Sequence, residues 1–291
     1  MKIFLTGASG FLGHHITADL TAAGHEVTGL VRSDAAADLL RQRGVKPVMG
    51  DITNPASLDA ALGAAEAVIH TAFDHDFSRF KANCEGDRRL IAHMGTRRAR
   101  SGVPLVVTYT TVVAAKEAGQ PARETDAPVG SDRAPRAATE EGVARALDLG
   151  ANVSVVRLPQ VHDRDRHGLV TNLLQISAKT RISAYVGKGD NRWCGAHVQD
   201  VARLFRLAVE AGETGARWHA VAEGAIPFIG IASAVARRTG CGIVSLTPEE
   251  AQTHFGPFAH LVGADAWSTA TLTRSRLDWT PSGPTLFDDL T

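Results

Sequence analysis

The opening residues, 1–13, constrain the fold more than any other stretch of the chain. A short apolar run at 3–5, the size of a buried parallel strand, leads into Gly7, Gly10 and Gly13, and an amphipathic helical pattern follows. In this setting the first glycine allows a tight turn, the second lets backbone approach a pyrophosphate, and the third lets helix pack on strand. Free N–H groups at a helix start bind phosphate. The stretch therefore predicts a dinucleotide site, and the alternative is a plain glycine-rich turn.

Strand-like and helical patterns alternate along the first half of the chain. Strand-like runs lie at 3–5, 27–31, 47–49, 67–69, 105–107 and 153–156, and helical patterns at 14–20, 35–43, 55–62, 80–101 and 137–149. Such alternation predicts a parallel sheet with helices on both faces, joined by right-handed crossovers. We therefore predict an α/β protein with a Rossmann-type doubly wound parallel sheet, whose cofactor-binding domain spans residues 1–159.

The remaining residues, 160–291, are less regular and are predicted to form a smaller substrate-binding domain. They include helical patterns at 198–211 and 229–238 and a strand-like run at 218–221. We expect this domain to cover the carboxyl edge of the sheet, where open α/β sheets bind ligands. Some of its segments are expected to return to the sheet.

Charge, cysteine content and hydropathy exclude several classes of partner, bound metal and location. The 31 basic residues balance the 31 acidic ones, so no net field attracts nucleic acid or an anionic membrane. The 3 cysteines have no paired spacing, which indicates a reducing compartment and neither disulfides nor a zinc site. No apolar run approaches the roughly 18 residues that span a bilayer, and the N-terminus is no signal peptide. We expect a cytoplasmic globular protein without a metal.

The end of the second predicted strand favours NADP over NAD. NAD sites usually place an acidic residue there to hold the ribose hydroxyl, whereas NADP sites remove it and supply a cation. Val31 stands at that position, and Arg32 follows with a planar guanidinium suited to phosphate. Ser33 can add a hydroxyl. The alternative is that Arg32 is an ordinary surface residue and Asp34 serves the ribose of NAD.

Several motifs together resemble the extended short-chain dehydrogenase/reductase family, within its NAD-dependent epimerase/dehydratase group. Residues 6–13 match the Thr-Gly-x-x-Gly-x-x-Gly motif of that group throughout. The other matching segments are Gly-Asp-Ile at 50–52, the fourth-strand segment at 68–73, Asn-x-x-Gly at 83–86, Arg-x-Pro at 157–159 and His-Val-x-Asp-Val-Ala at 197–202. The resemblance extends from Met1 to at least Leu207 and implies the fold and a dinucleotide cofactor.

The resemblance also implies which residues meet the cofactor. In that group the glycine loop holds the pyrophosphate, the segment after the third strand meets the adenine, and the fourth strand passes along the cofactor. With the residues after the second strand included, the expected contacts are Gly7, Ser9, Gly10, Phe11, Leu12, Gly13, Arg32, Ser33, Asp51, Ile52, Thr71, Ala72, Phe73 and Pro159.

The resemblance ends at the catalytic signature. The family carries Tyr-x-x-x-Lys on the helix after the fifth strand, with the tyrosine as general acid or base. Arg136 falls where the tyrosine belongs, and Glu140 falls where the lysine belongs. Neither of the 2 tyrosines, Tyr109 and Tyr185, has a lysine four residues later. The sequence is therefore identified as an atypical member of the family.

Two residues are candidates to act on a substrate oxygen. Thr110 matches the family's Ser/Thr at the end of the fifth strand, and its hydroxyl can hydrogen-bond that oxygen. Its other interpretation is a threonine that satisfies local backbone. Arg136 could stabilise an oxyanion or bind a carboxylate or phosphate. Its alternative is a surface ion pair with Glu140 at i,i+4. Tyr109 should face the opposite side of the strand from Thr110.

Histidines provide the candidates for a proton donor. His75 lies between Asp74 and Asp76, whose charges would raise its pKa toward neutrality; the alternative is a solvent-facing loop residue. His162 is a similar candidate, at the start of a charged segment, 162–168. We interpret that segment as a solvated loop, because its interleaved arginines would repel a metal ion.

The leading functional hypothesis is an NADP-dependent oxidoreductase that reduces a carbonyl or related unsaturated group on a small molecule. A non-catalytic NADP(H)-binding redox sensor is the alternative from a different class, and loss of the Tyr-x-x-x-Lys pair favours it. A nucleotide-sugar epimerase or dehydratase is the third. The resemblance also allows for a homodimer through the helices expected at 80–101 and 137–149.

Overall fold

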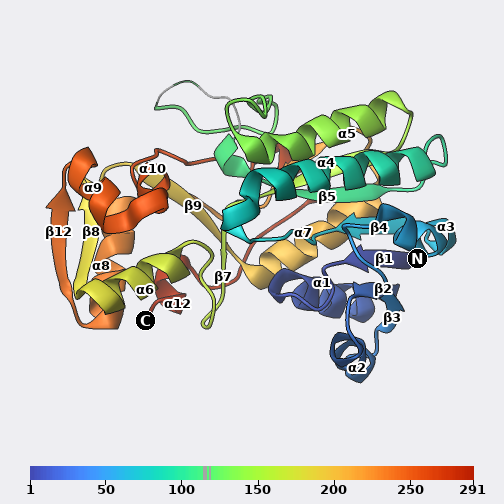
Figure 1. Ribbon diagram of the computed structural model, residues 1–291, viewed down its shortest axis with the longest axis horizontal. Coiled ribbons are helices and arrows are strands. Elements are labelled where there is room, and N and C mark those ends of the chain that lie inside the picture. The colour runs from blue at the N-terminus through green and yellow to red at the C-terminus, as the bar shows by residue number, and fades with distance from the viewer. Residues whose placement is uncertain (114–116, 118) are drawn as a thin grey trace.

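A parallel seven-stranded sheet forms the centre of the protein (Figure 1). The computed structural model describes residues 1–113, 117 and 119–291. The strands, in spatial order, are β10 (Arg217–His219), β6 (Val153–Leu158), β5 (Leu105–Thr110), β4 (Ala67–His70), β1 (Lys2–Thr6), β2 (Glu26–Val31) and β3 (Lys46–Met49). Every neighbouring pair is parallel. The predicted Rossmann-type sheet is confirmed.

Alternating side chains of the strands divide the core into two layers. On one face, residues such as Ile3 and Leu5 pack under α1 (Phe11–Ala22), α2 (Asp34–Gln42) and α7 (Val198–Ala211). On the other face, residues such as Phe4 pack under the helices α3 (Asp59–Ala64), α4 (Phe80–Arg97) and α5 (Ala138–Asp148). Strand side chains point alternately to the two faces, so a run that is apolar throughout is buried on both.

Two helical predictions differ from the structure at their ends. The helix expected at 55–62 is a 3₁₀ turn, η1 (Pro55–Leu58), followed by α3. The helix expected at 80–101 stops at Arg97, and Arg100 has a positive φ of 55°, which a continuing α-helix does not allow. Neither difference alters the order of the strands in the sheet.

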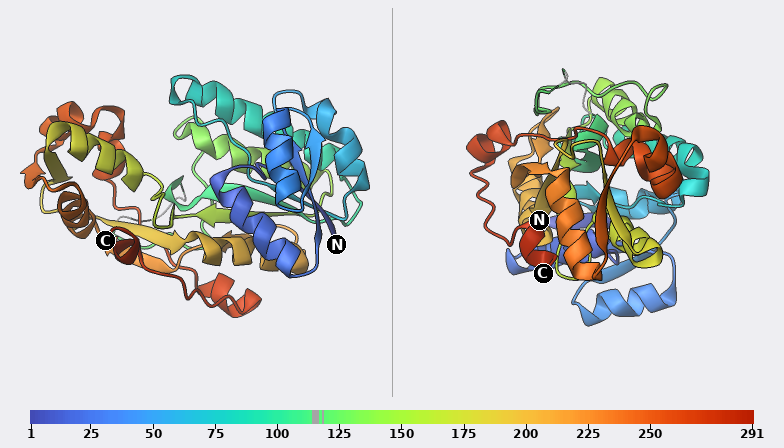
Figure 2. Two further views of the ribbon diagram at one scale, coloured as in Figure 1. Left: turned by 90° about the horizontal axis from the view of Figure 1, so that it is seen from below. Right: turned by 90° about the vertical axis from the view of Figure 1, so that its left-hand side faces the viewer.

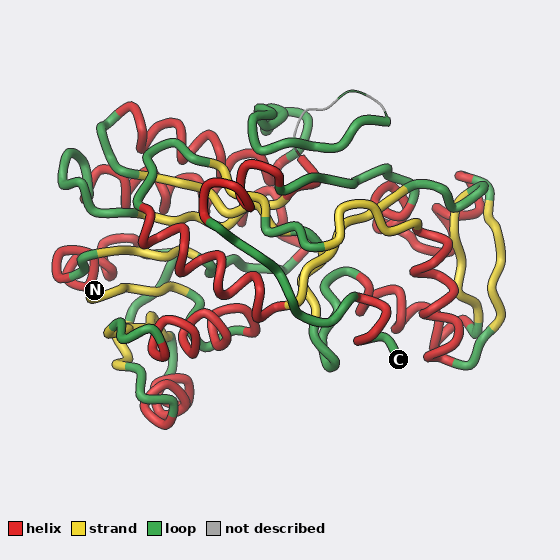
Figure 3. Tube along the Cα trace, turned by 180° about the vertical axis from the view of Figure 1, so that it is seen from behind, coloured by secondary structure: helices red, strands yellow, loops and turns green. Residues whose placement is uncertain are grey.

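A second lobe lies at the end of the molecule opposite the N-terminus (Figures 2 and 3). A three-stranded sheet of β11 (Glu223–Pro227), β9 (Arg192–His197) and β7 (Gln160–His162) leads into it, and β12 (Gly242–Leu246) pairs with β8 (Ile182–Val186). Its helices are α6 (Val170–Thr180), α8 (Phe228–Thr239), α9 (Pro248–Phe255), α10 (Ala259–Val262) and α12 (Leu286–Asp289). A third hydrophobic cluster holds these elements together.

Two segments of the second half return to the central sheet. Strand β10 pairs with β6 at its edge, and helix α7 lies across the face that α1 also covers. Helix α11 (Thr271–Leu277) packs beside them, with the hydroxyl of Thr273 accepting a hydrogen bond from the backbone N–H of His219. None of the helices in the described part of the chain is long and apolar enough to span a bilayer.

Candidate active site and cofactor cleft

A cleft of about 1200 Å³ opens at the carboxyl ends of the central strands. Open α/β sheets bind ligands at this edge, and the volume suits a dinucleotide together with a small substrate. The three candidate catalytic residues, Thr110, Arg136 and His75, all line it. The expected cofactor contacts that line it are Gly7, Ser9, Gly10, Phe11, Leu12, Gly13, Arg32, Ile52, Thr71, Ala72, Phe73 and Pro159. The fold thus brings residues from distant parts of the sequence into one cavity.

The glycine loop has the shape of a cradle. Gly7 has a φ of 77°, and a Cβ there would lie 2.6 Å from the hydroxyl oxygen of Thr71. A Cβ on Gly13 would lie 2.1 Å from the carbonyl oxygen of Gly7, so neither position tolerates a side chain. Gly10 is the N-cap of α1 and has no side chain to satisfy the first N–H groups of the helix. These residues fit the pyrophosphate of a dinucleotide.

Two expected cofactor contacts are not among the residues that line the cleft. Ser33 caps α2, its hydroxyl accepting a hydrogen bond from the N–H of Ala36 at 3.3 Å. The carboxylate of Asp51 accepts hydrogen bonds from the N–H and hydroxyl of Thr53, which lower the pKa of Asp51. Both side chains are therefore engaged in local structure, and their contacts with a cofactor stay predictions. Arg32, by contrast, is exposed at the cleft.

Arg136 is held at the cleft by a buried carboxylate. It lies in a 3₁₀ turn, η4 (Pro135–Ala137), and its Nη1 donates to Asp87 at 2.8 Å and to the hydroxyl of Thr139. Its Cζ lies 4.1 Å from the centre of the Phe73 ring. The alternative pairing with Glu140 is wrong. Glu140 is buried, and it forms ion pairs with Arg157 at 2.7 Å and Arg217 at 2.8 Å.

A buried hydrogen-bond chain connects Arg136 to the glycine loop. The N–H of Ala72 donates to the hydroxyl of Thr6, and that hydroxyl is hydrogen-bonded to Nδ1 of His70 at 2.7 Å. His70 then donates from Nε2 to Asp87 at 2.9 Å, and the other oxygen of Asp87 accepts from Arg136. Burial would raise the pKa of Asp87, but the bond from His70 and the charge of Arg136 hold it at about 2. Sequence reasoning missed this chain. Asp87 directly follows the Asn-x-x-Gly segment at 83–86, and nothing local marks its carboxylate as buried.

Thr110 ends β5 on the cleft side. Its hydroxyl accepts a hydrogen bond from the N–H of Val112 at 3.3 Å, so its proton can still be donated into the cleft. Tyr109 turns the other way, into the core under α4 and α5, as strand alternation predicts. Burial raises the pKa of Tyr109, so its hydroxyl is a weak acid there.

The expected effect on His75 is wrong in sign. Desolvation, followed by the positive charge of Arg136, lowers the pKa of His75, and the opposing effect of Asp74 is weaker. Sequence reasoning counted the neighbouring carboxylates but could not know that Arg136 folds toward the same place. His75 is thus neutral near pH 7. Its imidazole can accept a proton or relay one, but it does not hold a proton ready to donate.

Aromatic rings from both lobes meet at the mouth of the cleft. Three of them line it, and two that do not, Phe80 and Phe258, contact these. Phe77 is 57% exposed and stacks on Phe80 with 5.6 Å between ring centres. Phe258, from the second lobe in η5 (Gly256–Phe258), meets Phe77 edge-on at 6.1 Å. Phe73 lies 6.2 Å from Phe80 and 5.1 Å from His75. We refer to these five residues as the aromatic cluster.

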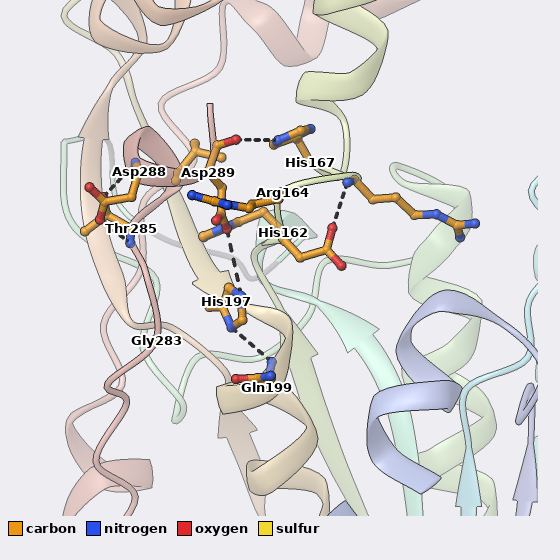
Figure 4. Close-up of polar contacts among 12 residues, drawn as sticks. His162, Arg164, His167, His197, Gln199, Gly283, Thr285, Asp288 and Asp289 are labelled. Atoms are coloured by element: carbon orange, nitrogen blue, oxygen red, sulfur yellow. Dashed lines mark hydrogen bonds and ion pairs between the residues drawn. The ribbon is translucent and has the colours of Figure 1, made fainter. Parts of the chain in front are cut away.

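Residues 164–166 of the segment at 162–168 are exposed, as expected of a solvated loop, but its two histidines are not. His162 is fully buried, and His167 is 1% exposed. Both donate hydrogen bonds to Asp289, near the C-terminus, at 2.7 and 3.2 Å respectively (Figure 4). His162 is therefore not a residue of the cleft lining, because a partner from a distant part of the chain draws it inward. No group of three or more metal-binding side chains is arranged around an ion site in the described residues.

Comparison with known proteins identifies the family. The model of the NAD dependent epimerase/dehydratase family matches residues 3–221. The chain belongs to that family. The resemblance seen in the motifs of the glycine loop and the sixth strand is thereby confirmed.

Similar proteins include a relative named a reductase, and a solved structure named a dehydratase shares the fold. An uncharacterized protein of Schizosaccharomyces pombe is 36% identical over 291 residues, covering 100% of this chain and 98% of its own length. A 2-alkyl-3-oxoalkanoate reductase of Stenotrophomonas maltophilia is 31% identical, covering 74% of this chain and 67% of that protein. The dTDP-glucose 4,6-dehydratase of Streptomyces venezuelae, solved with NAD, has a TM-score of 0.78 at 17% identity, covering 100% of this chain and 96% of that one. The epimerase/dehydratase family is thus one of NAD(P)-binding enzymes.

Proposed function

We propose that this protein is an NADP-dependent oxidoreductase that reduces a carbonyl or related unsaturated group on a small molecule. The observation that carries the proposal is the meeting of Thr110 and Arg136 in the cleft that also contains the glycine cradle. A reduced nicotinamide, when bound there, supplies a hydride. Polar groups aimed at the substrate oxygen then stabilise the charge that develops on it.

The chain's own residues divide this work. The hydroxyl of Thr110 donates a hydrogen bond to the substrate oxygen, and the guanidinium of Arg136 stabilises the developing negative charge. A guanidinium is a poor proton donor, so Arg136 orients and stabilises but does not protonate the substrate. Asp87 fixes the guanidinium through Nη1. The proton comes from water or through His75, which lines the same cleft.

The cofactor preference rests on Arg32. It is an exposed guanidinium at the cleft, directly after the buried Val31, where an acidic residue would favour NAD. Arg32→Ala is expected to weaken NADPH binding by tenfold or more and to leave NADH binding nearly unchanged, because only NADPH carries the 2′-phosphate. Calorimetric titration measures the affinity for both cofactors. Equal weakening of the two would show that Arg32 does not bind the 2′-phosphate.

The substrate class is inferred from the aromatic cluster. Phe73, His75 and Phe77 line the cleft and provide a wall that suits an apolar or aromatic carbonyl compound. The Stenotrophomonas relative is named a 2-alkyl-3-oxoalkanoate reductase, which supports a keto substrate with alkyl chains beside a carboxylate. Cofactor oxidation, followed by the absorbance of the reduced nicotinamide on a panel of such ketones and aldehydes, tests the proposal. Turnover faster on apolar than on sugar-like carbonyls is the expected result.

One observation favours a second candidate function, a non-catalytic NADP(H) sensor. Arg136 and Glu140, at the positions of the family's Tyr and Lys, are both engaged in ion pairs with buried partners. A protein that binds NADPH tightly and oxidises none of a wide carbonyl panel would be assigned to this class. The nucleotide-sugar epimerase or dehydratase is the third candidate, and a tightly retained NAD in the purified protein would favour it.

A further inference from the structure

A loop of the second lobe lies against the start of helix α1, at the glycine cradle. Arg166 places its Cζ 5.4 Å from the ring centre of Phe11, which is the first residue of the helix. Asp163, in the same loop, lies 3.8 Å from His15 of α1. Arg166 lines the cleft together with Gly7 and Gly10. An exposed guanidinium therefore faces the place where a pyrophosphate would contact the helix N-terminus.

The loop holds its own shape through Asp163. The carboxylate of Asp163 accepts hydrogen bonds from the backbone N–H groups of Asp165 at 2.9 Å and Arg166 at 2.8 Å. The N–H of Asp163 donates to the carbonyl of Arg166 at 2.8 Å. This closed turn leaves the side chain of Arg166 free to project toward the cleft, and it fixes the point from which that side chain starts.

Both ends of the loop are fixed to one residue near the C-terminus. His162 precedes the loop and donates to the carboxylate of Asp289, whereas His167 follows it and donates to the backbone carbonyl of Asp289 (Figure 4). Arg238 donates to the same carbonyl at 2.7 Å and to the carbonyl of Arg164 at 3.3 Å. Asp289 is 4% exposed and is not one of the residues that line the cleft. Its role is thus to hold the loop.

We propose that Arg166 clamps the pyrophosphate of the bound dinucleotide from the second lobe and that Asp289 is the positioning residue for this clamp. The inference rests on the dinucleotide part of the proposed function. Guanidinium binds phosphate oxygens through two parallel N–H donors, and the helix N–H groups contact the opposite side of the same group. Asp165 is the opposing charge, because its carboxylate also lines the cleft.

Ligand fragments test the clamp without any catalytic assay. Arg166→Ala is expected to weaken NADPH and ADP-ribose by about tenfold, the effect of losing one charge-assisted hydrogen bond. Adenosine 2′-monophosphate lacks the pyrophosphate, so its affinity should stay within twofold. Arg164→Ala is the matched control, because it removes the same charge from the same loop outside the cleft lining. Calorimetric titration of each ligand gives these affinities.

The outcomes of that experiment distinguish failure of the Arg166 contact from failure of the dinucleotide site. Unchanged NADPH binding in Arg166→Ala, or equal weakening by Arg164→Ala, would overturn the clamp. Equal weakening of adenosine 2′-monophosphate would also overturn it, since the loss would then not belong to the pyrophosphate. If the unaltered protein bound neither NADPH nor NADH, the dinucleotide assignment itself would fail before the clamp was tested.

A double-mutant cycle tests the positioning role of Asp289. Asp289→Asn should weaken NADPH severalfold in the unaltered protein and have no further effect in Arg166→Ala. A merely structural role would weaken binding equally in both backgrounds, and that result would overturn the assignment. His167→Gln, which alters the second anchor of the loop, should show the same dependence on Arg166 and replaces Asp289→Asn if that variant does not fold.

Discussion

At the scale of single residues, the site depends on groups whose partners lie far away in the sequence. Thr110 and Arg136 were placed by motif spacing, and the structure brings both to the cleft. The partner of Arg136 is Asp87, on a different helix, and not Glu140 one turn away. Local spacing predicts where a side chain starts, but the charge it meets is decided by the packing of α4 against α5.

Substitution of the two candidate catalytic residues should separate chemistry from binding. Thr110→Ala and Arg136→Ala are each expected to lower kcat by about tenfold or more, because each removes a group aimed at the developing oxyanion. Thr110→Ser keeps the hydroxyl and should retain most activity. NADPH affinity, measured by titration, should stay within about twofold. Full rates in both alanine variants would contradict the assignment.

The buried Asp87 should make stability depend on pH. Its folded pKa of about 2 lies below the ordinary value of 3.8 for an aspartate. A depressed carboxylate pKa contributes stability that is present above the unfolded pKa and is lost as the pH falls through the folded one, about 2 kcal/mol here. Urea unfolding between pH 5 and roughly pH 2 should therefore show a smaller loss for Asp87→Asn than for the unaltered protein. The same loss of unfolding free energy with falling pH in both proteins would contradict this prediction.

At the scale of elements, the order of strands and helices could be predicted from the sequence. The inner strands β1, β4 and β5 are largely buried on both faces, so they appear as mostly apolar runs, and the glycine spacing fixes the first turn. The edge strand β3 is partly exposed. The buried state of His162 and His167 could not be predicted. Their partner, Asp289, lies 127 and 122 residues away, and nothing local distinguishes a paired histidine from a solvated one.

The contact between β1 and α1 should be intolerant of a single methyl group. A Cβ at Gly13 would lie 2.1 Å from the carbonyl oxygen of Gly7, so Gly13→Ala must push the helix off the strand. We expect NADPH binding to fall by tenfold or more and the melting temperature to drop. Gly63→Ala in α3 is the control, because a Cβ there meets nothing within 4 Å. Its stability should be equal or slightly higher.

At the scale of the whole molecule, the two lobes meet at the mouth of the cleft. Phe77 follows β4 of the central sheet, and Phe258 belongs to η5 of the second lobe. Their rings meet 6.1 Å apart at the mouth. The sequence had no signal for this contact, because each phenylalanine alone has an ordinary context.

Removal of the ring contact should affect the substrate more than the cofactor. Phe258→Ala and Phe77→Ala are expected to raise KM for apolar carbonyl substrates by about threefold to tenfold, since each removes aromatic surface from the mouth. The NADPH dissociation constant should not change. Phe258→Leu preserves apolar volume, so its KM should lie between those of the unaltered protein and Phe258→Ala. Steady-state kinetics with equilibrium titration measures both quantities, and a selective loss of cofactor affinity would contradict this role.

The return of β10 and α7 to the central sheet has a consequence for how the polypeptide can be divided. A fragment ending at 159 would lack the edge strand that pairs with β6 and the helix that covers one face of the sheet. The complementary fragment would carry those two elements with nothing to pack against. Cleavage between the lobes therefore creates two incomplete cores. Residues 1–159 are therefore not expected to fold as a separate module without the segment that carries α7 and β10.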